Sequence, residues 1–505
     1  MRIHIINPVA DAPSYHSAEV YAAWGGDRRT TTADLAIATL AAFVPPDWEI
    51  RLTDEAIEPL GPDGDPCDEC DIVAITGKVS QRNRMIALAN AYRRRGKLVL
   101  VGGPYASLSP DDLRPHADIL VTGEIEDIAA GLFADLASGH WQDRYLGTRP
   151  DLRNSPVPRW DLYPNHGANL GTIQTSRGCP FTCDFCDVIQ YLGRHQRHKD
   201  PAQVIAELEV LYRHGYRRIF LADDNFTVYR RHAHAVLEAL SAWNAAHRDD
   251  PVCFMTQVSI DLARDPDLMA ACKAARLDTV FIGIETVNED SLRAAGKRQN
   301  LYHGAGEALN LILAHGIMVY AGIIVGFDAD GPDIFDRLNE FFATAPLPLI
   351  GIGALVAPPG TPLHARLATE GRLVGEDWQS AANPFATNIV PARMSRQALL
   401  DGVAQLCRDA YAPDAFAQRL GNFLAAYGGP AVAPAEAPVP IFIPPGERAL
   451  IKRLSGLGRE EKRMIMSSLG AATWRPDAQM AIVEFLSRYA QVRHMLGAKP
   501  KSLMQ

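Results

Sequence analysis

Three cysteines stand close together in the run Gly178-Cys-Pro-Phe-Thr-Cys-Asp-Phe-Cys186, separated by three and two residues. Cys179, Cys183 and Cys186 can therefore bind three irons of one 4Fe–4S cluster and leave the fourth iron without a protein ligand. An iron with an open position can bind a small molecule and pass an electron to it. The spacing predicts a redox-active cluster with one free iron.

Other uses of these thiols fit less well. A structural zinc site takes four ligands, usually as two separated pairs. His195 or His198 could supply a fourth ligand, but their spacing is not that of a zinc finger. A disulfide cannot use three thiols evenly. We therefore interpret the triplet as cluster ligands.

The remaining five cysteines suggest no second metal site. Cys67 and Cys70 form a pair in a loop rich in Gly, Pro and Asp, but a second pair for zinc is missing. Cys253, Cys272 and Cys407 fall in strand or helix patterns. Eight cysteines in 505 residues are also too few for a disulfide scaffold. We interpret these five as ordinary thiols.

Composition and charge are those of a globular protein. Hydrophobic residues make up 47% of the chain and charged residues 22%, with a net charge of -9 and no block of Lys and Arg. These features argue against a nucleic-acid partner. The apolar run in Met1–Pro8 is too short for a signal peptide, and no apolar stretch reaches about 18 residues. We expect a cytoplasmic protein without a transmembrane segment; peripheral membrane contact stays open.

Residues 1–145 alternate between strand and helix patterns, which predicts a doubly wound, Rossmann-like α/β domain. The expected strands are 2–7, 49–54, 72–76, 97–101 and 119–122, with helices at 32–43, 81–94 and up to 136. Ligands of such folds bind beyond the C-terminal strand ends, where Gly102-Gly103-Pro104 and Gly123-Glu124 stand. The alternative for these glycines is a plain turn that needs a positive φ.

A Pro-rich linker at 146–171 leads into a second α/β pattern at 172–374. Its expected strands are 172–175, 218–222, 252–258, 279–284, 318–325 and 351–356, which suit a partial (β/α)6 barrel. The cysteine loop follows the first strand, at the end of the barrel where sites form. Residues 375–505 predict a helical domain, with helices at 395–410, 413–427 and 448–469.

The triplet, with Phe185 in its second gap, resembles the signature of the radical S-adenosylmethionine (SAM) superfamily. Together the first two-thirds of the chain resemble radical SAM proteins with an N-terminal cobalamin-binding domain, most closely the subgroup that contains the hopanoid C-2 methylase. The segments that carry the resemblance are Val101–Ala106, Asp118–Glu124, Phe220–Phe226, Phe281–Glu285, Ile324–Phe327, Ala357–Leu363, Asp328–Phe335 and Pro391–Tyr411.

The resemblance implies that SAM binds the free iron and is held by residues at the strand ends. The candidates are Phe185 over adenine or the cluster, Asp223 and Asp224 near the amine, Gln257 and Ser259 near the ribose or carboxylate, Glu285 near the ribose or amine, and Gly326 near adenine. Helix capping is the alternative for Asp224, and cross-strand hydrogen bonding for Gln257 and Ser259. Gly326 could simply form a turn, and Arg177 could shield the cluster charge or form a surface salt bridge.

The resemblance also implies a cobalamin site at the strand ends of the first domain. Its candidate residues are Gly102, Gly103, Pro104, Tyr105, Gly123 and Glu124. The chain has no Asp-x-His-x-x-Gly motif to ligate cobalt, and Tyr105 stands where such proteins often have His. An N-terminal loop with Tyr15, Tyr21, Trp24, Arg28 and Arg29 either reaches the substrate region or decorates the surface.

The expected activity is a cobalamin-dependent radical SAM methylation of an unactivated carbon. Expected cofactors are a 4Fe–4S cluster, SAM and cobalamin, and expected partners are a small-molecule or lipid-like substrate and an external donor of the flavodoxin or ferredoxin type. The alternatives are a radical rearrangement, cyclisation or oxidation without methyl transfer, a radical SAM enzyme without cobalamin, and an iron–sulfur redox sensor. No catalytic residue and no specific substrate can be assigned from the sequence.

Overall fold

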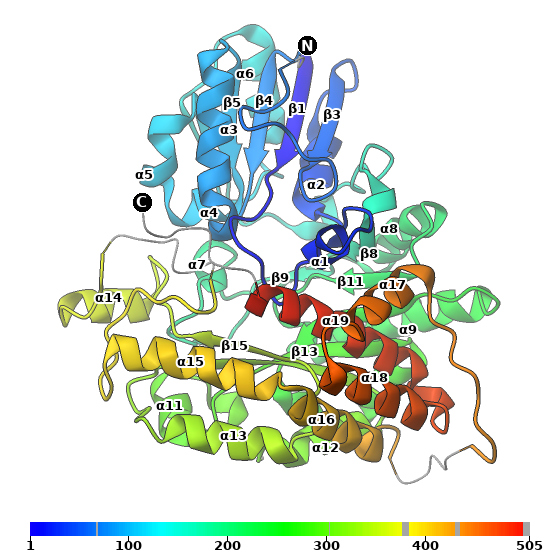
Figure 1. Ribbon diagram of the computed structural model, residues 1–505. Helices are drawn as coiled ribbons and strands as arrows, with labels where there is room; N and C mark the ends of the chain where they lie inside the picture. Colours follow the sequence, from blue (N-terminus) through cyan, green and yellow to red (C-terminus); the bar gives the residue numbers. More distant parts are fainter. Residues whose placement is uncertain (67–68, 302–303, 376–382, 430–434, 498–505) are drawn as a thin grey trace. The chain divides into compact units, whose positions relative to one another are not determined.

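The computed structural model describes residues 1–66, 69–301, 304–375, 383–429 and 435–497 (Figure 1). Cys67, one half of the Cys67/Cys70 pair, lies outside these ranges. The chain divides into two compact units. The first unit comprises Met1–Ala12, Arg28–Phe254 and Ala357–Asn383, and the second comprises Pro13–Asp27, Met255–Val356 and Pro384–Gln505.

A six-stranded parallel sheet forms the N-terminal part of the first unit. Its order is β3-β1-β4-β5-β6-β7, with bounds β1 Arg2–Asn7, β3 Glu49–Asp54, β4 Ile72–Thr76, β5 Leu98–Gly102, β6 Ile119–Thr122 and β7 Arg144–Leu146. The five predicted strands are confirmed within one residue. The three-residue β7 was not predicted because it is too short to show a period.

Helices cover both faces of this sheet, as a doubly wound fold requires (Figure 1). They are α2 Leu35–Phe43, α3 Arg82–Arg94, α4 Gly103–Leu108, α5 Pro110–Leu113 and α6 Ala129–Ser138. On one face, Met85, Leu88 and Tyr92 of α3 pack against Val73 and Val99 of the sheet. β1 lies between β3 and β4, so the direction of winding changes at β1, where such folds bind ligands.

The second sheet corresponds to the predicted partial (β/α)6 barrel. It is parallel and curled, and it forms a half-barrel. Its order is β15-β14-β13-β12-β11-β8-β2, with bounds β8 Ala168–Ile173, β11 Arg218–Leu221, β12 Cys253–Val258, β13 Leu277–Glu285, β14 Met318–Val325 and β15 Ile350–Ala354. Five of the six predicted strands are confirmed within two residues at each end. The first, predicted at 172–175, is wrong at its start, because β8 begins at Ala168 within the predicted linker. A seventh strand, β2 (Thr30–Thr32), pairs with β8. The helix predicted from residue 32 therefore begins only at Leu35, where the Asp34 side chain accepts a hydrogen bond from the Ile37 amide.

Helices alternate with these strands along the chain. In the first unit they are α7 Val188–Tyr191, α8 Pro201–Arg213, α9 Arg230–Ala246 and α14 Pro362–Thr369. In the second unit they are α10 Pro266–Ala274, α11 Glu289–Ala294, α12 Ala305–Ala314 and α13 Ile334–Thr344. A short helix, α1 (Glu19–Ala23), lies in the N-terminal segment of the second unit.

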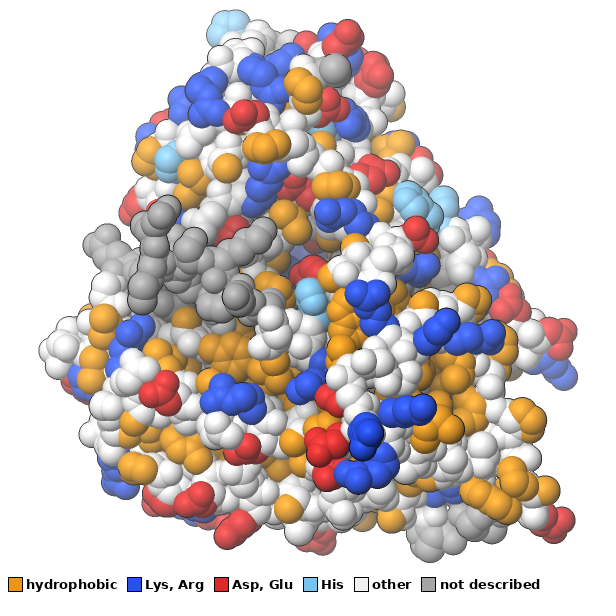
Figure 2. All heavy atoms as spheres, viewed as in Figure 1, with side chains coloured by type: hydrophobic (Ala, Val, Ile, Leu, Met, Phe, Trp, Pro, Cys, Tyr) orange, Lys and Arg blue, Asp and Glu red, His pale blue; other side chains and the backbone are white. Residues whose placement is uncertain are grey.

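The helical C-terminal region contains α15 Arg396–Ala410, α16 Pro413–Ala426, α17 Pro445–Leu454, α18 Arg459–Ala472 and α19 Gln479–Gly497. The single helix predicted at 448–469 is wrong: the chain breaks between Leu454 and Arg459, where Gly456 and Gly458 disfavour helix. The long helix α19 was not predicted. Blue side chains over α17 and α18 mark their basic residues (Figure 2). Among the described residues, no helix combines the length and the apolar character needed to cross a bilayer.

Gly103, the first residue of α4 after strand β5, is a position where glycine is clearly required. Its φ is +91°, and a Cβ there would overlap the Thr76 hydroxyl and come within 3.1 Å of the Gly77 amide. We expect Gly103→Ala to lower stability by more than about 2 kcal/mol, because overlap adds to the left-handed strain. Gly139→Ala is the matched control, since Gly139 has φ +74° but open space around it. Urea unfolding of the two variants measures the difference; equal destabilisation would contradict the role of close approach.

Candidate functional site

The cysteine loop is closed at its base by a short strand pair. After β8, the chain forms β9 (Ser176–Arg177), which pairs antiparallel with β10 (Arg197–His198). Gly178 follows β9 with φ +98°, and a Cβ there would lie 2.6 Å from the His195 carbonyl oxygen. Because only glycine fits this position, the chain can turn directly from β9 into the cysteines.

The three cysteines of this loop are not joined in disulfides. Cys183 is buried, and Cys179 and Cys186 are half-buried. Among the described residues, no three His, Cys, Asp or Glu side chains converge as ligands of one metal ion would. A cubane binds each thiolate at a different iron, so its three ligands stand farther apart than ligands of one zinc ion. Three thiolates without a fourth ligand suit a 4Fe–4S cluster with one open iron better than a four-ligand structural zinc site.

Asp223, at the end of β11, holds the start of the cysteine loop. Its Oδ1 accepts hydrogen bonds from the Thr175 amide at 2.7 Å and the Ser176 amide at 3.1 Å. Its Oδ2 accepts from the Thr175 hydroxyl at 2.5 Å and the Ser176 hydroxyl at 2.8 Å. A carboxylate offers about four acceptor positions, so this set fills them. Burial raises the pKa of Asp223, and these four hydrogen bonds oppose that rise.

Asp224 supports the next residue of the same loop. Its Oδ2 accepts a hydrogen bond from the Gly178 amide at 2.8 Å. Burial raises the pKa of Asp224 to about 6, against the lowering effect of that hydrogen bond. The next helix, α9, begins only at Arg230, so helix capping, the alternative for Asp224, is not what this side chain does. The two aspartates predicted beside the SAM amine thus both contact the cysteine loop.

Arg177 belongs to a buried ion-pair network that reaches the first sheet. Its Nη1 lies 2.7 Å from Glu124 Oε2 and 2.7 Å from Glu126 Oε1. Arg197, its partner in the β9–β10 pair, contacts both oxygens of Glu124 at 2.6 and 2.8 Å. All four side chains are at most 13% exposed. Burial alone would lower the pKa of Arg177, but Glu126 and Glu124 outweigh it and raise that pKa.

The buried ion-pair network shows which side chains Arg177 and Glu124 contact. Arg177 forms a buried salt bridge and not the predicted surface one, while its shielding of the cluster charge stays a prediction. Both oxygens of Glu124, which was predicted to contact cobalamin, are occupied by arginines. The network ties the base of the cysteine loop to the residues that follow β6.

The other predicted cobalamin residues lie together at the ends of β5 and β6. Gly102 is the N-cap of α4, Gly103 begins the helix and approaches Thr76, and Pro104 lies in its first turn. The Tyr105 side chain points into the core, where its hydroxyl donates to Asp112 Oδ2 at 2.7 Å and accepts from Arg82 Nε at 3.1 Å. Gly123 has φ +79°, and a Cβ there would overlap the Gly147 carbonyl. The glycines allow close backbone approach at this edge of the sheet.

Glu285 ends β13 in an unusual conformation, with φ +66°. Its Oε1 lies 2.7 Å from Lys297 Nζ, and both side chains are largely buried. A Cβ on Gly283 would overlap the Glu285 carboxylate, so the glycine makes room for this side chain to fold back over the strand. The buried carboxylate thus has a cationic partner within the protein, as burial of a charge requires.

The remaining predicted SAM residues lie at the ends of two strands, β12 and β14, and in the cysteine loop. Gly326 follows β14 with φ +114° and donates its amide to Asp330 Oδ2 at 3.0 Å, so it does form a turn. Gln257 is half-buried near the end of β12, and Ser259 is buried just beyond it. Phe185 is half-buried in the cysteine loop.

Glycines also open the inner face of the half-barrel in the second unit. Gly283 of β13, Gly322 of β14 and Gly351 of β15 are paired in one row across three neighbouring strands. Phe281 and Tyr320 form the row before it. A Cβ on Gly322 would come within 3.0 Å of the Phe281 ring, and one on Gly351 within 3.7 Å of the Tyr15 ring. The glycines therefore give aromatic rings access to this face.

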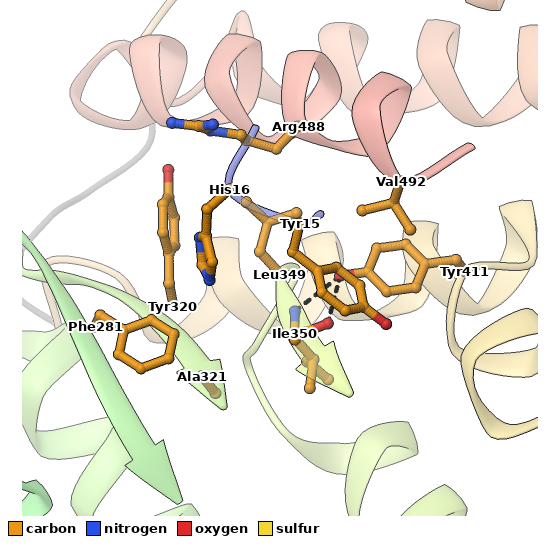
Figure 3. A pocket seen from close by; sticks show the side chains of 11 residues that line it. Tyr15, His16, Phe281, Tyr320, Ala321, Leu349, Ile350, Tyr411, Arg488 and Val492 are labelled. Atoms are coloured by element: carbon orange, nitrogen blue, oxygen red, sulfur yellow. Dashed lines mark hydrogen bonds between the residues drawn. The ribbon is translucent and has the colours of Figure 1, made fainter. Parts of the chain in front are cut away.

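A narrow hollow with a cavity volume of about 20 Å³ lies next to this row (Figure 3). Three parts of the second unit line it: the N-terminal segment, strands β13–β15, and the C-terminal helical region through the end of α15 and through α19. The lining residues are Tyr15, His16, Phe281, Tyr320, Ala321, Leu349, Ile350, Gly351, Tyr411, Arg488 and Val492. The lining is mostly aromatic and aliphatic, which is typical of small-molecule sites.

His16 and Arg488 are the polar groups that converge on the hollow, beside the Tyr320 ring (Figure 3). The His16 ring meets Phe281 edge-on with centroids 5.5 Å apart. His16 is exposed to solvent within the hollow, yet it is surrounded closely enough that burial lowers its pKa to about 4, with Arg488 acting in the same direction. His16 is therefore a neutral imidazole at pH 7.

Specific hydrogen bonds fix the walls of the hollow. Tyr15 donates its hydroxyl to the Ile352 carbonyl at 3.0 Å, and Tyr411 donates to the Ile350 carbonyl at 2.8 Å, so both cover the edge of β15. Gln491 of α19 accepts from the Val20 amide at 3.1 Å and donates to the Ser14 carbonyl at 3.1 Å. The predicted N-terminal loop thus contributes Tyr15 to an interior site rather than to surface decoration.

Sequence reasoning missed His16, Tyr320, Tyr411, Arg488 and the supporting Gln491. Tyr320 stands in a predicted strand, but nothing in its local pattern distinguishes a lining residue from a core residue. Arg488 and Gln491 lie on α19, which the sequence did not predict. His16 lies between Tyr15 and Tyr21, two residues of the predicted N-terminal loop. An imidazole at that position was the signal that could have identified His16 as a candidate.

Comparison with known proteins identifies the family. The model of the radical SAM superfamily matches residues 173–341, and a domain of unknown function, DUF4070, matches residues 361–480. An uncharacterized methyltransferase of Synechocystis sp., sll1242, is 34% identical over 78% of this chain and 73% of its own length. The chain belongs to the radical SAM superfamily. The matched residues include the cysteine loop and strands β11–β14, and the radical SAM superfamily uses a 4Fe–4S cluster and SAM.

Further radical SAM relatives and solved structures agree with this assignment. The hopanoid C-2 methylase of Rhodopseudomonas palustris is 32% identical over 68% of this chain and 65% of its own length. The fold resembles OxsB, a cobalamin-dependent SAM radical enzyme, with TM-score 0.61 and 14% identity over 98% of this chain and 79% of that one. It also resembles the methyltransferase TsrM of Kitasatospora setae, with TM-score 0.59 and 15% identity over 93% and 99% of the two chains.

Proposed function

We propose that this radical SAM enzyme uses cobalamin to methylate a carbon atom of a small-molecule substrate. The observation that carries the proposal is the closed cysteine loop after the first half-barrel strand, preceded by a doubly wound domain whose strand-end residues connect to that loop. The relatives named methyltransferase or methylase support methyl transfer, and the OxsB and TsrM structures, which contain cobalamin, share the fold.

The protein's own contribution to this reaction is to position groups and exclude water. When bound, the cluster, SAM and cobalamin supply an electron, a 5′-deoxyadenosyl radical and a methyl group. Cys179, Cys183 and Cys186 hold the cluster, and Asp223 and Asp224 fix the loop that carries them. We assign the cobalamin site to the ends of β4–β6, around Gly102–Tyr105 and Gly123, and an external one-electron donor of the flavodoxin or ferredoxin type completes the scheme.

We keep the strand ends as the region that contacts SAM, but we revise the roles of the acidic residues there. Gln257, Ser259, Glu285, Gly326 and Phe185 stay candidates for direct contact. Glu285 keeps one carboxylate oxygen beyond its contact with Lys297, whereas the acceptor positions of Asp223 are filled. A positioning role therefore suits Asp223 better than direct binding of the SAM amine.

The aromatic lining of the hollow in the second unit favours an apolar, ring-bearing substrate, which would have to displace part of that lining because the hollow has room for about one water molecule. Its lining contains four aromatic carbocycles and one neutral imidazole, and Arg488 is its basic group. Flat apolar groups pack well against aromatic faces and edges. The similarity to a hopanoid methylase is in keeping with such a substrate.

The test uses anaerobically purified protein with a reconstituted cluster, hydroxocobalamin and SAM carrying a deuterated methyl group. We expect reductant-dependent formation of 5′-deoxyadenosine and transfer of label to the bound corrinoid, with Cys183→Ala as the inactive control. An absence of 5′-deoxyadenosine would contradict the radical reaction. Retention of no corrinoid would instead favour a radical SAM enzyme without cobalamin.

A second candidate function is a radical cyclisation without methyl transfer. It is favoured by the anaerobic magnesium-protoporphyrin IX monomethyl ester cyclase of Synechocystis sp., which is 26% identical over 52% of this chain and 57% of its own length. The same assay distinguishes the two: cyclisation predicts 5′-deoxyadenosine with no label leaving the methyl group of SAM.

A further inference from the structure

The C-terminal helices expose an unusual concentration of large hydrophobic side chains. The described residues include 14 exposed large hydrophobic side chains, and six of them fall between residues 439 and 480. We name these six the C-terminal patch: Val439, Phe442, Leu457, Met466, Trp474 and Met480. Phe442 is 69% exposed and Met466 is 63% exposed, so these side chains stand out from the protein.

Hydrogen bonds hold the parts of the patch in place. The Val439 amide donates to the Thr473 carbonyl at 2.8 Å, and Gln479 donates to the Val439 carbonyl at 2.9 Å. The loop that carries Val439 and Phe442 is therefore fixed beside the corner between α18 and α19, where Trp474 and Met480 lie. The apolar side chains belong to a built surface.

Basic side chains share the exposed face of α18 with the patch. Arg459 and Lys462 precede Met466 by seven and four residues, which places them on the same side of the helix. The opposite side buries Met464 and Ile465. Leu457 precedes the first turn of α18 and Trp474 follows its last turn, so exposed apolar groups flank and interrupt a basic stripe.

The charge of this region differs from that of the whole protein. Helices α17 and α18 carry six basic residues and three acidic ones, whereas the whole chain has a net charge of -9. One of the three acids, Glu461, is buried and lies 2.9 Å from Arg493. The surface over α17 and α18 is accordingly rich in blue side chains with orange ones beside them (Figure 2). This surface is basic and apolar at once.

We propose that the C-terminal patch docks the protein on the surface of a membrane that contains anionic phospholipids. Exposed aromatic and aliphatic side chains enter the boundary between headgroups and acyl chains, while Lys and Arg beside them attract lipid phosphates. In this arrangement Phe442 and Trp474 insert, and the basic side chains of α17 and α18 face the headgroups. The same basic charges would also attract an acidic protein. We favour a membrane because the apolar side chains of the patch protrude one by one from a loop and a helix corner, where they can insert between lipids. The proposal concerns location and does not depend on which substrate is methylated.

The test measures binding of the full-length holoenzyme to vesicles by sedimentation. We expect binding to vesicles with about 30 mol% phosphatidylglycerol in phosphatidylcholine to exceed binding to pure phosphatidylcholine by about tenfold or more. The double variant F442S/W474S should bind at least about tenfold more weakly at any salt concentration. The variant K452Q/K462Q should bind more weakly at about 0.1 M salt and lose part of the salt dependence.

Matched controls separate docking from general surface effects. W141S/L146S removes two exposed hydrophobic side chains, 41% and 68% exposed, from the first unit and should bind like the unchanged protein. Circular dichroism and iron content should be the same for all variants. The proposal is overturned if the protein does not bind the anionic vesicles, or if F442S/W474S binds as well as the control. It is also overturned if an acidic protein, such as a flavodoxin, binds the patch while vesicles do not.

Discussion

Replacing Asp223 by alanine should release the start of the cysteine loop and remove most of the cluster from the protein. The substitution deletes acceptors of four hydrogen bonds and leaves the Thr175 and Ser176 amides buried without partners. Each unsatisfied buried group costs about 1–3 kcal/mol, so the docked loop loses roughly 2–6 kcal/mol relative to undocked conformations. We expect the iron-to-protein ratio to fall to a small fraction of its normal value and 5′-deoxyadenosine formation to drop by about 30-fold or more.

Asp223→Asn distinguishes a bracing role from direct SAM binding. The amide oxygen can accept from both backbone amides, and the NH2 group can donate to the two hydroxyls, which can rotate to accept. We therefore expect Asp223→Asn to keep its cluster and a KM for SAM within about threefold of the unchanged enzyme. A large rise in KM with the cluster intact would show instead that the carboxylate charge contacts the SAM ammonium group.

Glu124→Gln should have the next largest effect, and it should act on the cysteine loop. In the unchanged protein, the carboxylates of Glu124 and Glu126 balance the charges of Arg177 and Arg197. After the substitution, Glu126 is the single buried carboxylate beside the two arginines. Removing one member of a buried ion pair costs about 3–5 kcal/mol because the remaining charge stays desolvated. We expect a lower midpoint in thermal unfolding, reduced iron content and an altered electron paramagnetic resonance spectrum of the reduced cluster.

Two further variants make this result specific. The double variant E124Q/R197Q restores charge balance and should recover most of the iron content. Glu69→Gln removes a carboxylate that is 81% exposed and contacts Arg2 on the surface, and it should change stability by less than about 1 kcal/mol. If Glu124 instead contacts cobalamin directly, E124Q will lose corrinoid while its cluster stays normal, and R197Q will not compensate.

The sequence alone was sufficient for features that depend on local pattern and spacing. The separation of Cys179, Cys183 and Cys186 predicts that they bind one cluster, because a cubane can take three thiolates from one short loop. The half-barrel strands are buried apolar runs between turn residues, so their period shows in the sequence without knowledge of their neighbours. The same local reasoning failed where the signal was weak, as for three-residue β7 and for α19, whose buried residues lie on several faces.

Only the tertiary structure decided what the acidic residues do. Asp223, Glu124 and Glu285 each end a strand, and by sequence each was a candidate for contact with a cofactor. In the structure the partners of Asp223 are 47 and 48 residues away, and Arg177 and Arg197 lie 53 and 73 residues from Glu124. A carboxylate is recognisable from its residue type, but its binding capacity depends on which of its oxygens are already used, and folding brings those partners together.

For the hollow in the second unit as well, the sequence shows some of the residues and only the folded structure shows how they meet. Tyr15 was noticed as one aromatic residue among several in an N-terminal loop, but its hydrogen bond to Ile352 joins positions 337 residues apart. The row of Gly283, Gly322 and Gly351 exists only through the register of three strands. The sequence by itself therefore determined the cofactor chemistry, which resides in a short motif. The tertiary structure decided the shape of the hollow, because that shape is made from segments that meet only when the chain is folded.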